Sequence, residues 1–127
     1  MAKDIPDPDI WQVDAIADYQ AWWLGLAEGL QDEIAAIVEG CLEIQGPRLG
    51  RPYADTLKES RHENMKELRV QYQGDPWRIF FAFDPRRHAI LLIGGCKSGD
   101  PKFYKKMIPK ADDLYDAHLE TLKKAKK

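Results

Sequence analysis

Three charged residues fall where a predicted β-hairpin would bring them onto a single face. Side chains alternate between the two faces of a strand, so Glu67 and Arg69 of the predicted strand 65–72 lie together, opposite its apolar residues. In the next predicted strand, 77–83, Arg78 is out of phase with most of the large apolar side chains. A carboxylate beside two guanidinium groups suits chemistry on a phosphate, because the first accepts a proton and the others bind phosphate oxygens.

A third predicted strand adds a further cation to this region. Residues 89–93 would place apolar side chains on both faces of the strand, as in the interior of a sheet. Gly94, Gly95 and Lys97 follow at the end of this strand. We interpret the paired glycines as open backbone that a ligand can approach beside the lysine.

Helices on both sides of these strands in the sequence are expected to support them. Residues 1–9, rich in Asp and Pro, are expected to be loose, and residues 11–13 to form a brief edge strand. An aromatic stripe near residues 19–26 predicts one helix, and a regular apolar stripe predicts a second over 29–45. We expect the two helices to pack as a hairpin on the sheet.

The remaining segments complete the expected domain. Residues 48–64 show no clear period and are interpreted as a long ordered loop that could touch a ligand. A short helix is expected to start near residue 103 and to restart at Pro109, ending in a basic tail, 123–127. Together these elements predict one domain, 1–127, with helices packed on a sheet.

Charge is divided unevenly along the 127 residues, whose net charge is −2. Residues 1–50 hold two Lys or Arg against ten Asp or Glu, whereas residues 51–127 hold 17 against 11. This division is compatible with a basic working surface on the sheet and an acidic helical layer behind it.

Several classes of protein are disfavoured by the composition. The N-terminus lacks the pattern of a signal peptide, and the apolar runs are shorter than the roughly 20 residues that span a bilayer. The two cysteines and three histidines lack the paired spacing of a zinc site. We therefore expect a cytoplasmic protein with no membrane span, no metal and no cofactor.

The order of these elements resembles the RelE superfamily of bacterial toxins, and within it the HigB-like, phage-derived branch. The residues that carry the resemblance are 49–57, 64–69, 77–84, 90–97, Tyr104 and Pro109. It implies a RelE-like compact α+β domain, in which two N-terminal helices pack on a twisted, mainly antiparallel sheet and a C-terminal helix follows. It further implies a metal-independent endoribonuclease that cuts mRNA on the translating ribosome. It also implies a hetero-oligomer with a helix-turn-helix, HigA-like antitoxin.

Matched position by position, the resemblance implies catalytic roles for Glu67, Arg69, Arg78, Lys97 and Tyr104. Glu67 stands where better-known members carry a lysine on the open face of the sheet. Glu67 is the candidate general base, and the three cations are expected to stabilise the charge of the phosphate. The phenol of Tyr104 is expected to give a proton or to stack on an RNA base. The expected RNA contacts are Lys66, His62, Arg61 and Phe80.

Other interpretations of these residues remain open. Glu67 could simply pair with Arg69 or Arg78, and Tyr104 could be an aromatic core residue. His88 has the setting of a solvated turn residue, and His118 that of a structural one. ParE-type toxins share the fold but bind DNA gyrase, and a noncatalytic binding protein would use the same sheet face only to dock a partner.

Overall fold

The structure, a computed structural model, describes residues 10–125, so the expectations for residues 1–9 and for Lys126 and Lys127 lie outside it. One five-stranded sheet has the order β1-β5-β4-β3-β2, with β1 parallel to β5 and every other pair antiparallel. The strands are β1 Val13–Ala15, β2 Ala54–Thr56, β3 Met65–Tyr72, β4 Asp75–Phe83 and β5 Ala89–Cys96. The expected α+β fold with a mainly antiparallel sheet is confirmed.

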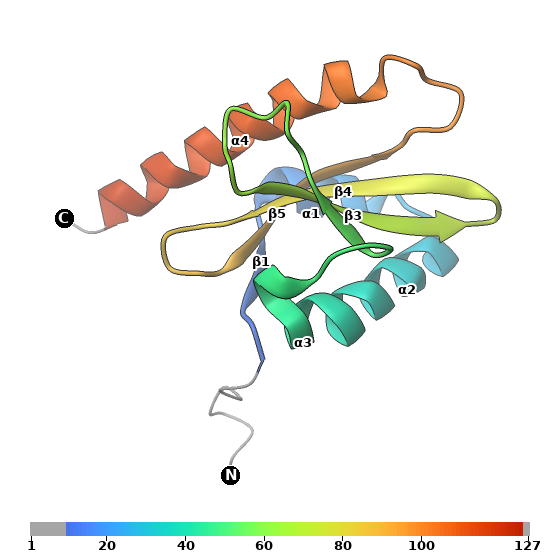
Figure 1. Cartoon of the computed structure of the whole chain (residues 1–127), viewed down its shortest axis with the longest axis horizontal. Helices are drawn as coiled ribbons and strands as arrows, with labels where there is room; N and C mark the ends of the chain where they lie inside the picture. Colours follow the sequence, from blue (N-terminus) through green and yellow to red (C-terminus); the bar gives the residue numbers. More distant parts are fainter. Residues whose placement is uncertain (1–9, 126–127) are drawn as a thin grey trace, which may run out of the picture.

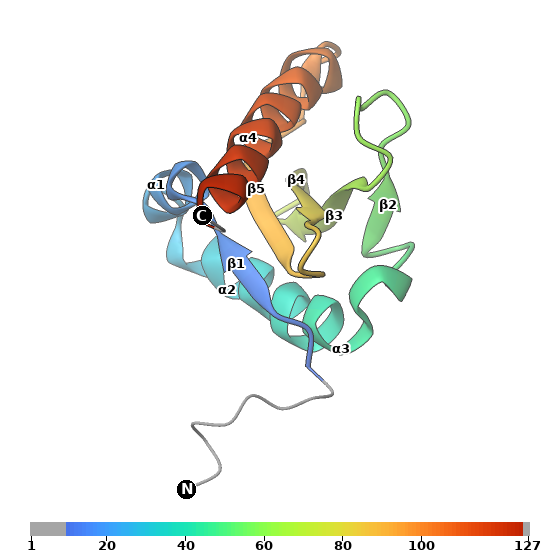
Figure 2. The same cartoon turned by 90° about the vertical axis from the view of Figure 1, so that its left-hand side faces the viewer.

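Helices cover both faces of the sheet (Figure 1 and Figure 2). On one face lie α1, Ala17–Leu24, and α2, Glu28–Ile37, which continues through a π-helical turn, Val38–Leu42, into α3, Glu43–Gln45. On the other lies α4, Phe103–Ala125. The predicted helical hairpin is therefore confirmed, although the π turn within its second helix was not foreseen.

The side chains of β4 point alternately to the two faces of the sheet and contribute to two cores, one under each helical layer. Ile79 and Phe81 pack with the residues of α1 and α2, whereas Phe80 and Ala82 pack with those of α4. A register shift between Phe80 and Phe81 interrupts the pairing of β4 with β5, but the two phases stay as the sequence predicted.

The edge strand lies two residues later than expected. Trp11 donates its backbone N–H to the carbonyl of Glu43, 2.8 Å away, and its ring packs on Gly46 and Phe83. This contact holds Trp11 against the end of the second helix, so the ladder with β5 begins only at Val13.

Two predictions for the residues that follow the N-terminal helices were wrong. The expected loop 48–64 contains β2, which pairs with β3 and is too short to show a period of two. The expected break at Pro109 is absent, because α4 runs through it. Ile108 and Ala111, on either side of the proline, are buried in one core, and this packing outweighs a missing backbone hydrogen bond.

The paired glycines at the end of β5 are not open backbone. A Cβ atom at Gly94 would overlap the ring of Trp22, and one at Gly95 would lie 3.1 Å from Phe103. Both glycines allow aromatic rings to approach the sheet, one on each face. The interpretation of a ligand approaching this backbone was therefore wrong.

Candidate functional site

The side chains of Glu67, Arg78 and Tyr104 form a hydrogen-bonded chain between the sheet and α4. The hydroxyl of Tyr104 donates to Oε1 of Glu67 at 2.8 Å and accepts from Nε of Arg78 at 3.2 Å. Arg78 also donates through a terminal nitrogen to the Trp77 carbonyl at 3.0 Å. The phenol is thus fixed between a carboxylate and a guanidinium that come from neighbouring strands.

Two further cations border this chain. Arg69 is the register partner of Arg78, and its Nε lies 3.8 Å from Oε2 of Glu67. The ammonium of Lys97 lies 5.2 Å from the centre of the Tyr104 ring, within the range of a cation–π contact. The structure therefore brings together all five residues that the resemblance pointed to, from β3, β4, the end of β5 and α4.

Glu67 and Arg78 are buried, although these residues were expected on an open face of the sheet. The side chains of Glu67 and Arg78 are each 5% exposed, while that of Arg69 is 25% exposed. The cause is α4, which places Phe103 and Tyr104 against Phe80, the register partner of Glu67. The cluster is therefore partly open at Arg69, Lys97 and Tyr104 and closed at its centre.

Neither arginine is hydrogen-bonded to the carboxylate of Glu67. Nε of Arg78 is 3.6 Å from Oε1, and Nε of Arg69 is farther still from Oε2, so both separations exceed a hydrogen bond. A purely structural buried ion pair usually needs close, hydrogen-bonded geometry to offset desolvation. Oε2 therefore keeps accepting capacity that the described residues leave unused.

The environment of Tyr104 keeps its phenol protonated. Burial raises the pKa of Tyr104, and the hydrogen bond to Glu67 and the charge of that carboxylate raise it further, whereas Arg78 opposes them. A phenol in this setting is suited to donate a proton rather than to accept one.

Glu67 is accessible along β2, the edge strand that pairs with β3. Glu67 lines a cavity of 370 Å³ together with Arg51, Asp55, Thr56, Leu57, Lys58 and Glu59. Tyr104 lines a second cavity of 440 Å³ whose walls include Glu59, Arg61 and Lys105. Arg51, Lys58 and Glu59 were not among the residues predicted for the site, because they flank β2, a strand too short to be recognised in the sequence.

The four expected RNA contacts do not join the cluster. Phe80 is fully buried in the core, so the prediction that it contacts RNA was wrong. By alternation Lys66 lies on the α1 and α2 side of β3, opposite Glu67. Arg61 and His62 are engaged with α4: Arg61 donates to Asp113 at 3.0 Å, and His62 lies 2.7 Å from Asp116.

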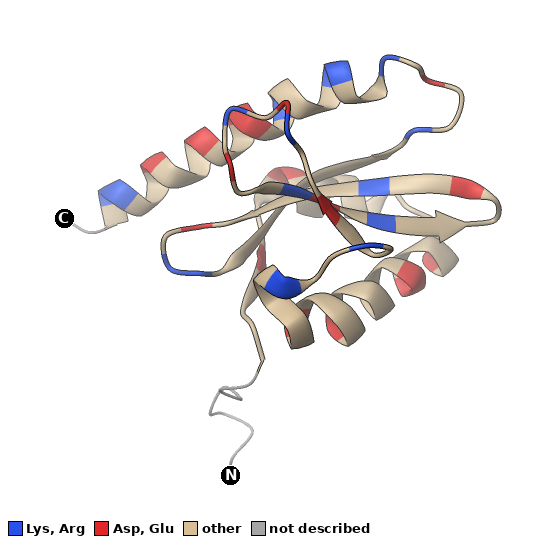
Figure 3. Ribbon diagram, viewed as in Figure 1, with Lys and Arg blue, Asp and Glu red and all other residues tan. Residues whose placement is uncertain are grey.

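Charge on the folded chain follows the elements (Figure 3). Both signs of charge lie on the strands of the sheet, whereas the charged residues of α2 are all acidic, and α4 has acidic residues in its middle and lysines toward its ends. The expected acidic layer on α2 is therefore joined by a second acidic stretch over the opposite face.

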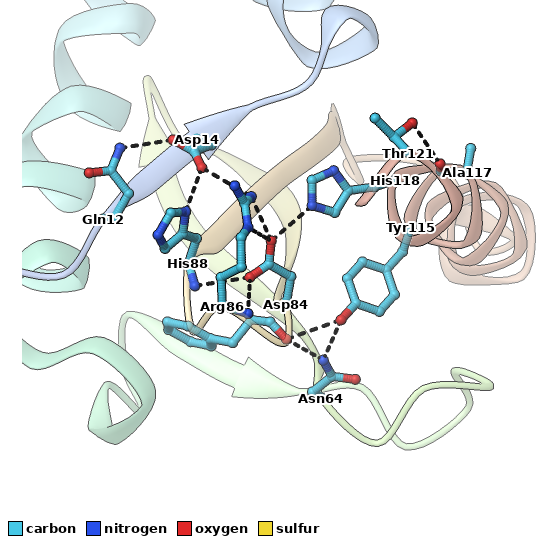
Figure 4. A network of polar contacts seen from close by, with 11 residues as sticks. Gln12, Asp14, Asn64, Asp84, Arg86, His88, Tyr115, Ala117, His118 and Thr121 are labelled. Atoms are coloured by element: carbon cyan, nitrogen blue, oxygen red, sulfur yellow. Dashed lines mark hydrogen bonds and ion pairs between the residues drawn. The ribbon is translucent and has the colours of Figure 1, made fainter. Parts of the chain in front are cut away.

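A separate polar network ties the far end of α4 to the sheet (Figure 4). The buried carboxylate of Asp84 contacts His118 at 2.9 Å and Arg86 at 2.7 Å. His88 lies 3.0 Å from Asp14 of β1, so it is half-buried and not the solvated turn residue that was expected. The contact of His118 agrees with a structural role.

Residues 10–125 contain neither a metal-binding group of side chains nor a helix suited to crossing a membrane. No group of three or more His, Cys, Asp or Glu there is arranged to hold a metal ion. Within the same residues, no helix combines the length and the apolar composition that crossing a membrane requires.

Known proteins resemble this chain in sequence. Residues 21–116 match the family described as "Phage derived protein Gp49-like (DUF891)". From Mycobacterium tuberculosis, "Putative toxin HigB2" is 43% identical over 111 residues, covering 86% of this chain and 54% of that protein. "Putative toxin HigB3" of the same organism is 44% identical over 94 residues, covering 73% of this chain and 80% of that protein. The chain therefore spans about half the length of HigB2.

The fold also has a solved counterpart. The crystal structure of the toxin-antitoxin complex RelBE2 from Mycobacterium tuberculosis matches with a TM-score of 0.51 at 11% identity, covering 71% of this chain and 94% of that chain. This likeness confirms the RelE-like fold. With the family match over most of the sequence and close relatives named HigB, the chain belongs to the Gp49-like family of phage-derived proteins, in its HigB-like branch.

Proposed function

We propose that this protein is the toxin of a type II toxin-antitoxin system and acts as an endoribonuclease on mRNA bound to the translating ribosome. The observation that carries the proposal is the Tyr104 hydroxyl held between Glu67 and Arg78, with Arg69 and Lys97 beside it. The names of the HigB relatives support the assignment as a toxin.

The proposed reaction needs no metal. Glu67 accepts the proton of the ribose 2′-hydroxyl, whose oxygen attacks the adjacent phosphorus. The bond from phosphorus to the 5′-oxygen breaks, and Tyr104 gives that oxygen its proton. The products are a 2′,3′-cyclic phosphate and a 5′-hydroxyl, so atoms and charge balance.

The three cations stabilise the phosphorane between these proton transfers. Arg69, the more exposed arginine, binds the incoming phosphate, and Arg78 and Lys97 lie near the phenol where charge develops on the leaving oxygen. Substrate binding has to separate Tyr104 from Glu67, because the phenol occupies Oε1 in the free protein. Oε2 and the adjoining cavity offer the 2′-hydroxyl its approach.

We further propose that a HigA-like helix-turn-helix antitoxin, encoded beside this chain, neutralises it in the cytoplasm as a hetero-oligomer. The support is the assignment to the HigB-like branch. The match to RelBE2 supports the fold alone.

Mapping RNA ends in cells tests activity and partnership together. Induction of this chain is expected to arrest growth and to create new 5′-hydroxyl ends within translated messages. Induction of Glu67→Gln, or of the natural protein with a neighbouring helix-turn-helix gene, is expected to create neither. Growth arrest with intact transcripts and altered plasmid supercoiling would instead identify a gyrase inhibitor.

A further inference from the structure

A cavity on the opposite side of the sheet takes no part in the proposed reaction. It measures 330 Å³ and lies where α1 and the helical segment that begins with α2 meet the strands β1 and β5. Its lining includes Tyr19, Trp23, Ile34 and Leu91, with Glu39 and Glu43. Leu91, Ile34 and Tyr19 belong to the core under α1 and α2, not to the core under α4.

Among the described residues, the carboxylates of the cavity lack a positive partner. Burial raises the pKa of Glu43, and the neighbouring charge of Glu39 raises it further. Within residues 10–125, the ion pairs that form involve neither carboxylate. Two like charges held beside an apolar wall therefore leave a place for a cation.

A buried polar group lines the same cavity. Tyr19 is 4% exposed, and its hydroxyl has no hydrogen-bond partner among the described residues. Its ring stacks on that of Trp23, with centroids 6.2 Å apart and planes 28° apart. An orphaned hydroxyl is costly unless a partner arrives, so Tyr19 is an observation independent of the acidic pair.

We propose that this cavity binds an arginine side chain presented by a basic segment of a protein partner. A guanidinium is flat and can stack on Trp23, while its several N–H groups reach carboxylates and a hydroxyl at once. A lysine offers one compact ammonium and suits the same set less well.

The charge of the surrounding chain argues for a basic protein segment as the occupant. Residues 10–47, which build β1, α1, α2 and α3, contain seven Asp or Glu and no Lys, Arg or His. Such a surface repels RNA and attracts a basic polypeptide. Because the cavity and the Tyr104 cluster lie on opposite faces of the sheet, the partner can bind here without covering Glu67.

The test follows the indole N–H resonance of Trp23 during titration with a short blocked arginine peptide. We expect this resonance to shift in the natural protein, a lysine peptide to bind more weakly, and a glutamine peptide to cause no shift. Glu39→Gln and Glu43→Gln are each expected to weaken binding of the arginine peptide about three- to tenfold. The resonances of Trp11 and Trp77, which do not line the cavity, serve as internal references.

Glu33→Gln is the matched control, because Glu33 is exposed on α2 and does not line the cavity. It removes the same charge and is expected to change the affinity by less than about twofold. Circular dichroism checks the fold of each variant, and the more exposed Glu39 provides the decisive variant if Glu43→Gln unfolds. An unmoved Trp23 resonance, an equal loss in Glu33→Gln, or the same shift with an RNA oligonucleotide would overturn the proposal.

Discussion

The phenol of Tyr104 donates a 2.8 Å hydrogen bond to Oε1 of Glu67, a residue 37 positions earlier in the chain. This contact joins the first full turn of α4 to β3, so one bond serves both the packing of the helix and the arrangement of the proposed site. Substitutions in the cluster should therefore be judged by cleavage rate and by stability in the same experiment.

Tyr104→Phe removes the hydroxyl while keeping the ring. We expect cleavage to slow by roughly 10²-fold or more, because the proposed proton donor is lost. Stability should fall by about 1–2 kcal/mol, because Glu67 and Arg78 lose a hydrogen-bonding partner in a buried setting. Tyr53→Phe on an exposed tyrosine is the control and should change neither quantity.

Arg69→Ala and Arg78→Ala should separate phosphate binding from folding. Arg69 is partly exposed, so its loss should cost under about 1 kcal/mol of stability while reducing cleavage strongly. Arg78 is buried beside Glu67, so its loss should cost about 3 kcal/mol, because an uncompensated carboxylate remains. Thermal melts of the two variants, run beside cleavage assays, would contradict this assignment if the losses of stability were equal.

The Asp84 network predicts how stability depends on pH. Burial opposes ionisation of Asp84, but hydrogen bonds from His118, Arg86 and the His88 backbone outweigh it and hold the pKa of Asp84 below its usual value of 3.8. Its stabilisation is therefore present above that value and is lost as the pH falls through the lower pKa of the folded state.

Asp84→Asn should lower the stability at neutral pH by about 2 kcal/mol, because it removes hydrogen bonds to a charged acceptor. The stability of this variant should also fall less steeply than that of the natural protein as the pH drops below 3.8. Denaturant titrations across this pH range measure both effects. Asp32→Asn on the exposed side of α2 is the control, and an identical pH profile for Asp84→Asn and the natural protein would refute the role of Asp84.

Gly94→Ala should destabilise the fold through steric overlap. The added Cβ would collide with the Trp22 ring, and forcing an extra carbon into a packed core typically costs about 2 kcal/mol. Gly50→Ala, where nothing lies within 4 Å of the added carbon, should stay near the natural stability. Equal melting temperatures for the two variants would show that the Trp22 ring can move aside without a loss of stability.

The strands of the hairpin could be predicted because their patterns are strong and local. The alternation around Glu67 and Arg69, and the opposite phase of Arg78, follow from a period of two that the folded β3 and β4 keep. The apolar strand pattern before Lys97 pointed to that residue, whereas the family resemblance alone placed Tyr104 with them. Their convergence depends on the path of the chain after β5, which no short window of sequence contains.

The burial of the site could not be predicted from these patterns. A polar phase on a strand does not reveal that α4 will cover it, so Glu67 and Arg78 were expected on an open face and Phe80 on the RNA surface. The cavity beside Glu67 was missed for a related reason, because β2 forms through tertiary pairing with β3 and has no alternation of its own. In both cases a neighbouring element decided the exposure.

The most direct test is single-turnover cleavage of ribosome-bound mRNA by Glu67→Gln, measured beside a thermal melt. If Glu67 is the proton acceptor, the rate should fall by roughly 10²- to 10⁴-fold while the variant remains folded. Glu63→Gln, on an exposed residue of the preceding loop, should cleave at the natural rate. A folded Glu67→Gln variant that cleaves within a few-fold of the natural rate would contradict the account and leave Glu67 as a buried partner of the two arginines.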